Sequence, residues 1–240
     1  MQPKSCIFSN IRLLDLLRQG HLDEEAFLRE LPETERAAIG TPQLWSAKDH
    51  IVHRTFWHQD LVLKLTAILQ HQEVEPNKED DDQINARVFE AHRLDSFSAI
   101  HAESERVYAQ LITLLEQLSE EDLMDSHRFA PISGERPLYG SFLGSCYEHD
   151  QEHLAQYYSD RNYREQTIAI REQCAKRIVE VEVPAWVKGW FLYNLACFYA
   201  QLPELKRAAA LLQEALTLAP DLKEHSMRDP DLAALRDQSA

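Results

Sequence analysis

Glycine and long apolar runs are both scarce in this chain, which has 6 glycines among its 240 residues. Sheet proteins use glycine at hairpin turns and bulges, whereas helical bundles need little of it. The longest apolar runs are a few residues long, far below the roughly 20 that cross a bilayer. The N-terminus lacks an apolar stretch followed by a small-residue cleavage site. We therefore expect a soluble, all-α protein with no membrane partner.

Cysteine pairs and basic clusters are missing as well. The four cysteines, Cys6, Cys146, Cys174 and Cys197, are far apart and form no CxxC pair. This argues against disulfides and a thiolate zinc site, and it fits a cytoplasmic location. Acidic residues outnumber basic ones by 40 to 25, for a formal net charge of -15. Nucleic-acid binding depends on clustered Lys and Arg, so we exclude nucleic acid as a partner.

Apolar residues recur with a helical period in four segments before residue 160. The second segment opens with Ser46 and Asp49 in the S-x-x-D capping pattern. An acidic stretch over 71–83 (HQEVEPNKEDDDQ) separates the second segment from the third. A crossover of that length lets the two helices that it joins run parallel. The predicted long helices span residues 11–31, 46–69, 96–118 and 138–158, with a short helix over 84–91.

The pattern changes after Arg161, where three further helices are predicted over 163–181, 185–201 and 203–218. Five residues of this part fall where a tetratricopeptide repeat places its Leu, Tyr, two Ala and closing Pro: Leu195, Tyr199, Ala208, Ala215 and Pro220. Small alanines let the second helix of such a repeat press closely against the first. We therefore predict two domains, a helical bundle over 1–160 and a tetratricopeptide-like (TPR-like) extension over 161–240.

Two histidines stand four residues apart on the predicted fourth helix, His149 and His153 in YEHDQEHL. This spacing places both imidazoles on one helix face, a common way to supply two metal ligands. They continue a predicted buried stripe that includes Phe142 and Cys146. Two explanations fit: hydrogen-bonded core histidines, or a metal that satisfies both rings at once. Asp150 follows His149, so the segment is not the H-E-x-x-H motif of zinc proteases.

His53 is a candidate for a third ligand. It lies about 10 Å from the start of the second helix at roughly 1.5 Å per residue. His153 lies a similar distance from the end of the fourth helix, so antiparallel packing would bring the rings to one level. Trp57, one turn after His53, is predicted to wall the site. Three histidines with an open position are typical of a catalytic metal site, and zinc and nickel both suit them.

Other polar residues near this site receive no role from the sequence. His50 is expected to be a solvated neighbour close to the start of the helix. Glu148 and Glu152 flank the ligands but should point sideways or outward, so neither is assigned as a base and the catalytic residues stay unknown. Three further histidines are interpreted as ordinary residues without such partners: His58, His92 and His101.

The stretch WSAKDHIVHRTFW over 45–57 resembles the W-S-x-K-D-x-x-x-H-x-x-x-W signature of the DinB/YfiT-like superfamily. Asn85, LSEEDL over 118–123 and YEHDQEH over 147–153 recur in the same order and with similar spacing. The resemblance is strongest to the ClbS/DfsB branch and covers roughly residues 8–160. The TPR-like part lies outside it.

This resemblance implies a DinB-like up-down-down-up four-helix bundle. It also implies a divalent-metal triad with one histidine from the second helix and two from the fourth, which map onto His53, His149 and His153. The family often has an aromatic residue after the first histidine of the fourth helix, where this chain has Asp150. That departure is expected to alter substrate access or the surroundings of the ligands.

The family does not fix a reaction, since its members include thiol S-transferases, an isomerase and hydrolases that open a strained ring. One hypothesis is a metal-dependent hydrolase or thiol transferase that acts on an electrophilic small molecule in detoxification or stress. The alternative is a non-catalytic protein whose TPR-like hairpin docks a protein partner instead of only capping the bundle. The sequence names neither the substrate nor the metal, and it leaves the oligomeric state open.

Overall fold

The described chain is built from helices. The computed structural model describes residues 10–134, 136–202 and 204–237, and within these ranges no strand occurs apart from one isolated bridge between Thr41 and Leu44. The predicted all-α class is confirmed for these residues. None of the helices in the same ranges combines the length and the apolar character that a membrane crossing requires.

Fourteen α-helices, one π-helix and one 3₁₀ helix follow one another along the described residues. Their bounds are α1 Asn10–Glu30, α2 Glu33–Arg36, α3 Ala47–Leu69, α4 Asp81–His92, α5 Phe97–Gln117, α6 Glu120–Met124, α7 Ala130–Ser133, α8 Leu138–Phe142, the π-helix η1 Leu143–Glu148, α9 His149–Ser159, α10 Arg164–Glu180, α11 Ala185–Gln201, α12 Leu205–Leu218, α13 Leu222–Ser226, the 3₁₀ helix η2 Pro230–Leu232 and α14 Ala233–Asp237.

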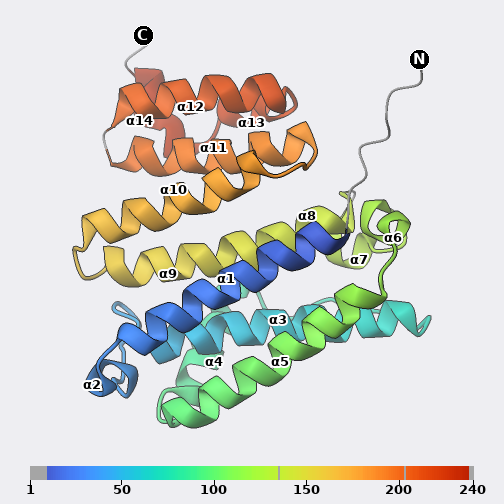
Figure 1. The fold of residues 1–240 in the computed structure, drawn as a ribbon, viewed down its shortest axis with the longest axis vertical. Helices are drawn as coiled ribbons and strands as arrows, with labels where there is room; N and C mark the ends of the chain where they lie inside the picture. The colour runs from blue at the N-terminus through green and yellow to red at the C-terminus, as the bar shows by residue number, and fades with distance from the viewer. Residues whose placement is uncertain (1–9, 135, 203, 238–240) are drawn as a thin grey trace. The chain divides into compact units, whose positions relative to one another are not determined.

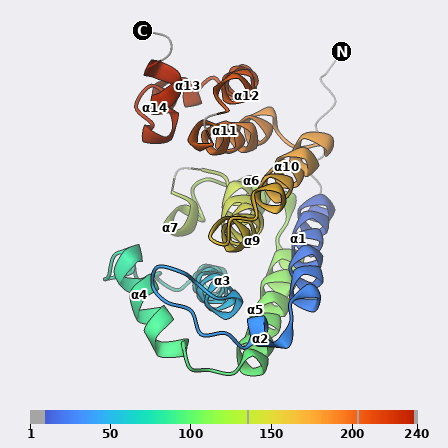
Figure 2. The same cartoon turned by 90° about the vertical axis from the view of Figure 1, so that its left-hand side faces the viewer.

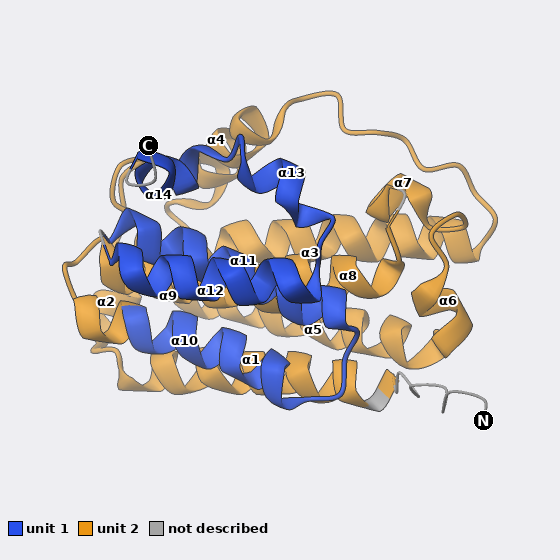
Figure 3. Ribbon diagram, turned by 90° about the horizontal axis from the view of Figure 1, so that it is seen from above, with its two compact units in different colours: residues 1–8, 168–240 blue, residues 9–167 orange. Residues whose placement is uncertain are grey.

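The chain divides into two compact units, coloured separately in Figure 3. The bundle unit spans residues 9–167 and the C-terminal unit contains residues 168–240, so the division falls inside α10. The predicted domains, 1–160 and 161–240, stay predictions.

Long helices dominate the bundle unit. In Figure 1, α3 and α5 run in one direction, whereas α1 and the succession α8–η1–α9 run in the other. Contacts join α3 to α4, α5 and α9, and join α1 to α5, η1 and α9. Figure 2 looks almost along α3 and α9, and α4 lies on the side of α3 opposite α1 and α5.

A hydrophobic cluster holds one end of these helices together. Its buried members come from α1, α3, α5 and α9: Phe27, Leu28, Ala47, Ile51, Ile100 and Tyr157. The predicted S-x-x-D cap is present beside this cluster. The Ser46 backbone and hydroxyl both donate to the Asp49 carboxylate, and the Asp49 amide donates to the Ser46 hydroxyl. A side chain at Gly40 would collide with that carboxylate, since its Cβ would lie 2.0 Å from Oδ2.

The predicted fourth helix is interrupted. Instead of a continuous helix over 138–158, a six-residue π-helix, Leu143–Glu148, stands between α8 and α9 and ends immediately before His149. A π-helical turn rotates the residues that follow it relative to a continuous α-helix. Across from it, a Cβ at Gly20 would lie 3.2 Å from the Tyr147 ring, so α1 packs closely against this turn.

The crossover between α3 and α5 contains more helix than the sequence predicted. The expected short helix over 84–91 extends to Asp81–His92, because Asp80 caps it by accepting from the Gln83 amide at 2.8 Å. The Trp57 indole of α3 donates to the Asn85 side-chain oxygen of α4 at 3.1 Å. The acidic crossover is thereby tied to the helix that carries His53.

Close packing of α11 against α12 forms the centre of the C-terminal unit. Ala208 and Ala215 are fully buried, and a Cβ at Gly189 would lie 2.6 Å from that of Ala219. Glu172 of α10 pairs with Arg207 and accepts from the Tyr199 hydroxyl. The predicted helix start at Pro203 lies outside the described residues, and α12 begins at Leu205.

Candidate metal centre

The structure brings together the three histidines that the sequence selected. The Nε2 atom of His149 lies 3.1 Å from Nε2 of His53 and 3.1 Å from Nε2 of His153. Ligand atoms of all three residues fall within 4.8 Å of one another. His53 comes from α3, whereas His149 and His153 come from the first two turns of α9.

These separations fit a shared ion. Imidazole nitrogens at about 2.0–2.1 Å from one zinc, at angles of roughly 90–110°, lie about 3.0–3.4 Å apart. Hydrogen bonding alone explains the arrangement less well, because the in-plane lone pair of one ring nitrogen accepts one good hydrogen bond. The Nε2 atom of His149 faces two ring nitrogens at once. A cation at the point of convergence would use the lone pairs of all three rings.

The three rings are also held in the charge state that a metal requires. Burial lowers the pKa of His53 to about 3, and the neighbouring His149 and Arg54 act in the same direction. Burial likewise lowers the pKa of His149 and that of His153, with His53 and His50 contributing at His153. Each ring is therefore neutral at pH 7, the state in which imidazole ligates a metal.

The residues around the start of α3, from Trp45 to Asp49, lie next to this site or hold α3 in place. The Trp45 ring stacks on the His153 ring with centroids 5.9 Å apart and planes at 13°. The backbone carbonyl of Trp45 accepts a hydrogen bond from Arg161 at 3.1 Å. Lys48 is buried and donates to the Asp95 carbonyl at 2.9 Å, which ties α3 to the end of the crossover. The W-S-x-K-D residues thus position the first turns of α3.

Comparison with models of protein families identifies the family of this chain. A family model described as the DinB superfamily matches residues 17–157, which is more than half of the chain. The chain belongs to the DinB superfamily. No match was found among curated proteins or among solved structures.

In this DinB-superfamily chain, His50 lies deeper than the sequence suggested. The expectation of a solvated neighbour is wrong: His50 is 5% exposed, and its Nδ1 lies 3.1 Å from Nδ1 of His153. Burial, together with Arg54 and Arg161, lowers the pKa of His50 to about 3. Its register one turn before His53 gave no hint of the contact, because the contact is made across helices.

A buried charged group braces the helices that carry the ligands. Arg54, next to His53, pairs with Glu24 of α1 and lies 3.3 Å from Asp150, next to His149. Although burial opposes its charge, Glu24 and Asp150 raise the pKa of Arg54. Asp150 thus ties α9 to α3 beside the two ligands, which gives the DinB chain a reason to carry a carboxylate at this position.

His58 belongs to the same buried group, so its interpretation as an ordinary residue without such partners is wrong. Its Nε2 lies 3.1 Å from Asp150 Oδ1. Burial opposes its charge, but Asp150 and hydrogen bonding with Cys146 raise its pKa well above the usual value. In the same way, His58 and Arg54 overcome burial and lower the pKa of Asp150.

Of the remaining residues that the sequence analysis discussed, some lie at the site and others lie away from it. Trp57 lies beside the site, with its ring centroid 6.4 Å from that of His53. Glu148, the last residue of the π-helix, is buried, whereas the sequence predicted that it points sideways or outward. His92 and His101 are outside the site but are not without partners. Their rings lie 2.9 Å from Asp95 and 2.8 Å from Glu25, respectively.

Proposed function

We propose that this DinB-superfamily protein binds one divalent metal ion, zinc or nickel, through His53, His149 and His153. The observation that carries the proposal is the convergence of three neutral Nε2 atoms, with 3.1 Å from His149 to each of the other two. The helix directions in Figure 1 support an up-down-down-up four-helix bundle, and we propose from the sequence signature that it is of the ClbS/DfsB type. In such a bundle, facing helices supply the ligands of a buried site.

We further propose that the protein acts on an electrophilic small molecule as a hydrolase or thiol transferase. A divalent ion at such a site lowers the pKa of a bound water or thiol toward neutrality. The chain itself holds the three rings neutral, and Arg54 paired with Asp150 fixes the spacing of α3 and α9 beside them. Trp45, Trp57 and Phe56 are partly exposed and offer apolar surface near His53.

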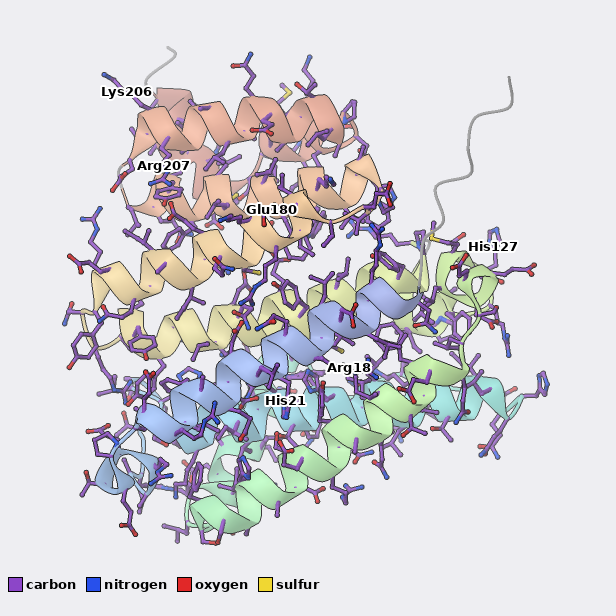
Figure 4. The ribbon with its side chains drawn as sticks, viewed as in Figure 1. Arg18, His21, His127, Glu180, Lys206 and Arg207 are labelled. Atoms are coloured by element: carbon purple, nitrogen blue, oxygen red, sulfur yellow. The ribbon has the colours of Figure 1, made fainter. Side chains whose placement is uncertain are left out.

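Elemental analysis of the purified full chain tests the metal. We expect close to one equivalent of zinc or nickel in the wild-type protein after removal of loosely held ions. His149→Ala should lose most of it, because two remaining imidazoles bind far more weakly than three. His127→Ala is the control, since His127 is exposed in the turn between α6 and α7 and is labelled in Figure 4. Equal metal content in all three proteins would refute the site.

Turnover tests the reaction. The metal-loaded protein is incubated with an epoxide as a strained electrophile, with and without a low-molecular-weight thiol. Product formed with water alone identifies a hydrolase, and product that requires the thiol identifies a transferase. Chelation and His149→Ala should both abolish it. Unchanged turnover after complete metal removal would contradict a metal-dependent reaction.

A groove in the C-terminal unit favours a second candidate function, docking of a protein partner by the TPR-like hairpin. It measures about 760 Å³ and is lined by apolar side chains of α12 and the segments after it, among them Leu212, Leu216 and Leu235. Lys206 and Arg236 also line it, which suits a helix with an acidic edge. Leu212→Asp should abolish partner binding and leave the metal content intact, whereas His149→Ala should do the reverse.

A further inference from the structure

Two His/Glu pairs face each other between α1 and α5, away from the three-histidine site. His21 and Glu25 are four residues apart on α1, and His101 and Glu105 are four residues apart on α5. Residues at this spacing share one helix face. The two helices run in opposite directions in Figure 1, so each histidine meets the glutamate of the other helix. His21 Nε2 lies 3.3 Å from Glu105, and His101 Nε2 lies 2.8 Å from Glu25.

We propose that His21, Glu25 and Glu105 form a second divalent-metal site that bridges α1 and α5. One imidazole nitrogen and two carboxylate oxygens of these residues lie within 4.8 Å of one another. Ligand atoms on one ion are about 3.0–4.2 Å apart, so small rotations of the glutamate side chains complete the site. The Glu105 side chain is 42% exposed and has room for that movement.

The histidine of this second site is already oriented. The His21 ring stacks on Tyr108 of α5 with centroids 3.9 Å apart and planes at 11°. Its side chain is 17% exposed, and Figure 4 shows it between α1 and α5. His101 contacts the Glu25 carboxylate and restrains it in the way that outer partners orient metal ligands. Two of the three ligands are thus held before an ion arrives.

Ion pairing alone is the competing explanation, and it accounts for less of the arrangement. Partly exposed pairs between side chains contribute about 0–1 kcal/mol each. Glu105 faces the His21 ring and Glu25 faces the His101 ring. Carboxylate oxygens of the two glutamates lie within 4.8 Å of each other, so two negative charges are close together. A divalent cation neutralises both, and the net charge of -15 favours its approach.

The ligand set indicates the class of ion. One nitrogen and two carboxylate oxygens suit zinc or manganese, whereas calcium and magnesium prefer sites built entirely of oxygen. With one side open to solvent, water completes the coordination. We expect this site to bind more weakly than the three-histidine site, because its ligands are more exposed and less rigid.

Equilibrium dialysis of the full chain against zinc, followed by elemental analysis, tests this inference. We expect two equivalents in the wild-type protein at saturation. His149→Ala should keep the weaker equivalent, whereas His21→Gln and Glu105→Gln should keep the tighter one and lose at least about tenfold in affinity for the other. Asp15→Asn is the matched control, because Asp15 is an exposed carboxylate on the same helix.

The outcomes separate the two sites. A second equivalent that binds equally well to wild type, His21→Gln and Glu105→Gln would overturn the α1–α5 site, as would saturation at one equivalent that His149→Ala removes. If His149→Ala changed nothing while the α1 and α5 variants lost zinc, the three-histidine proposal would fail and this site would stand. Thermal unfolding without metal shows that each variant is folded.

Discussion

The Nδ1 atom of His50 lies 3.1 Å from Nδ1 of His153, while Nε2 of His153 faces His149. A ring that ligates through Nε2 carries its proton on Nδ1. If His153 ligates the proposed ion through Nε2, its Nδ1 donates to Nδ1 of His50, which then accepts. In that arrangement His50 selects the tautomer of His153 that exposes a lone pair to the metal position.

Removal of that acceptor should weaken metal binding. We expect His50→Leu to lower zinc affinity about 10- to 100-fold, in line with the loss of a partner that orients a ligand. His50→Asn should retain most of the affinity, because its side-chain oxygen can occupy the position of Nδ1. Zinc titration of the metal-free proteins measures both. Equal affinities for Leu and Asn would show that His50 only fills space.

Metal binding should depend weakly on pH between 7 and 5. An ordinary imidazole takes up a proton near pH 6.5 and then competes with the metal. Burial lowers the pKa of His53 to about 3 and also lowers the pKa values of His149 and His153, so protons compete with the metal only below the usual pH range of histidine. Equilibrium dialysis at several pH values gives the affinity. A tenfold loss of affinity per pH unit below 6.5 would contradict this.

The folded fraction must be followed at each pH in that experiment. In the unfolded chain these histidines protonate near pH 6.5, whereas in the folded chain they stay neutral, so the free energy of unfolding falls as pH drops below about 6.5. His50, with a pKa of about 3, acts in the same direction. His58 acts in the opposite direction, because its pKa is raised. Circular dichroism of the metal-free protein at each pH measures the folded fraction, which shows which of the two effects on the free energy of unfolding is larger.

Asp150→Asn should destabilise the bundle unit strongly. It removes the carboxylate that pairs with both Arg54 and His58 and leaves positive charge buried between α3 and α9. Breaking one partner of a buried charge pair costs about 3–5 kcal/mol. Asp160→Asn, at the exposed end of α9, should change the free energy of unfolding by about 0.5 kcal/mol or less. Urea unfolding of both variants makes the comparison, and similar midpoints would refute the bracing role.

Ala208→Leu tests the packing of α11 against α12. Ala208 is fully buried, so the larger side chain should overpack the contact and cost about 1–3 kcal/mol. Ala210→Leu, two residues along α12, is exposed and should be close to neutral. Denaturant unfolding of the full chain in a background with Trp45 and Trp57 replaced by phenylalanine, so that only Trp186 and Trp190 of α11 fluoresce, reports this unit. A neutral effect at Ala208 would contradict the close approach of the two helices.

The sequence by itself determined the helical class, the position of the long helices and the histidines of interest. Scarce glycine, a regular apolar period and the Ser46–Asp49 cap are local signals, and they act within one helix turn. The His149–His153 spacing is equally local. His53 was selected by matching depths on two helices, which required only helix rise and an assumed direction.

Only the tertiary structure decided which groups surround that triad. The contacts of His50 with His153 and of Arg54 with Asp150 span about a hundred residues of sequence and have no periodic signature. The π-helix before His149 also escaped prediction, because apolar spacing does not distinguish it from an α-helical turn. Burial then set the charge states of these histidines, and burial is a property of the packed helices rather than of any one segment.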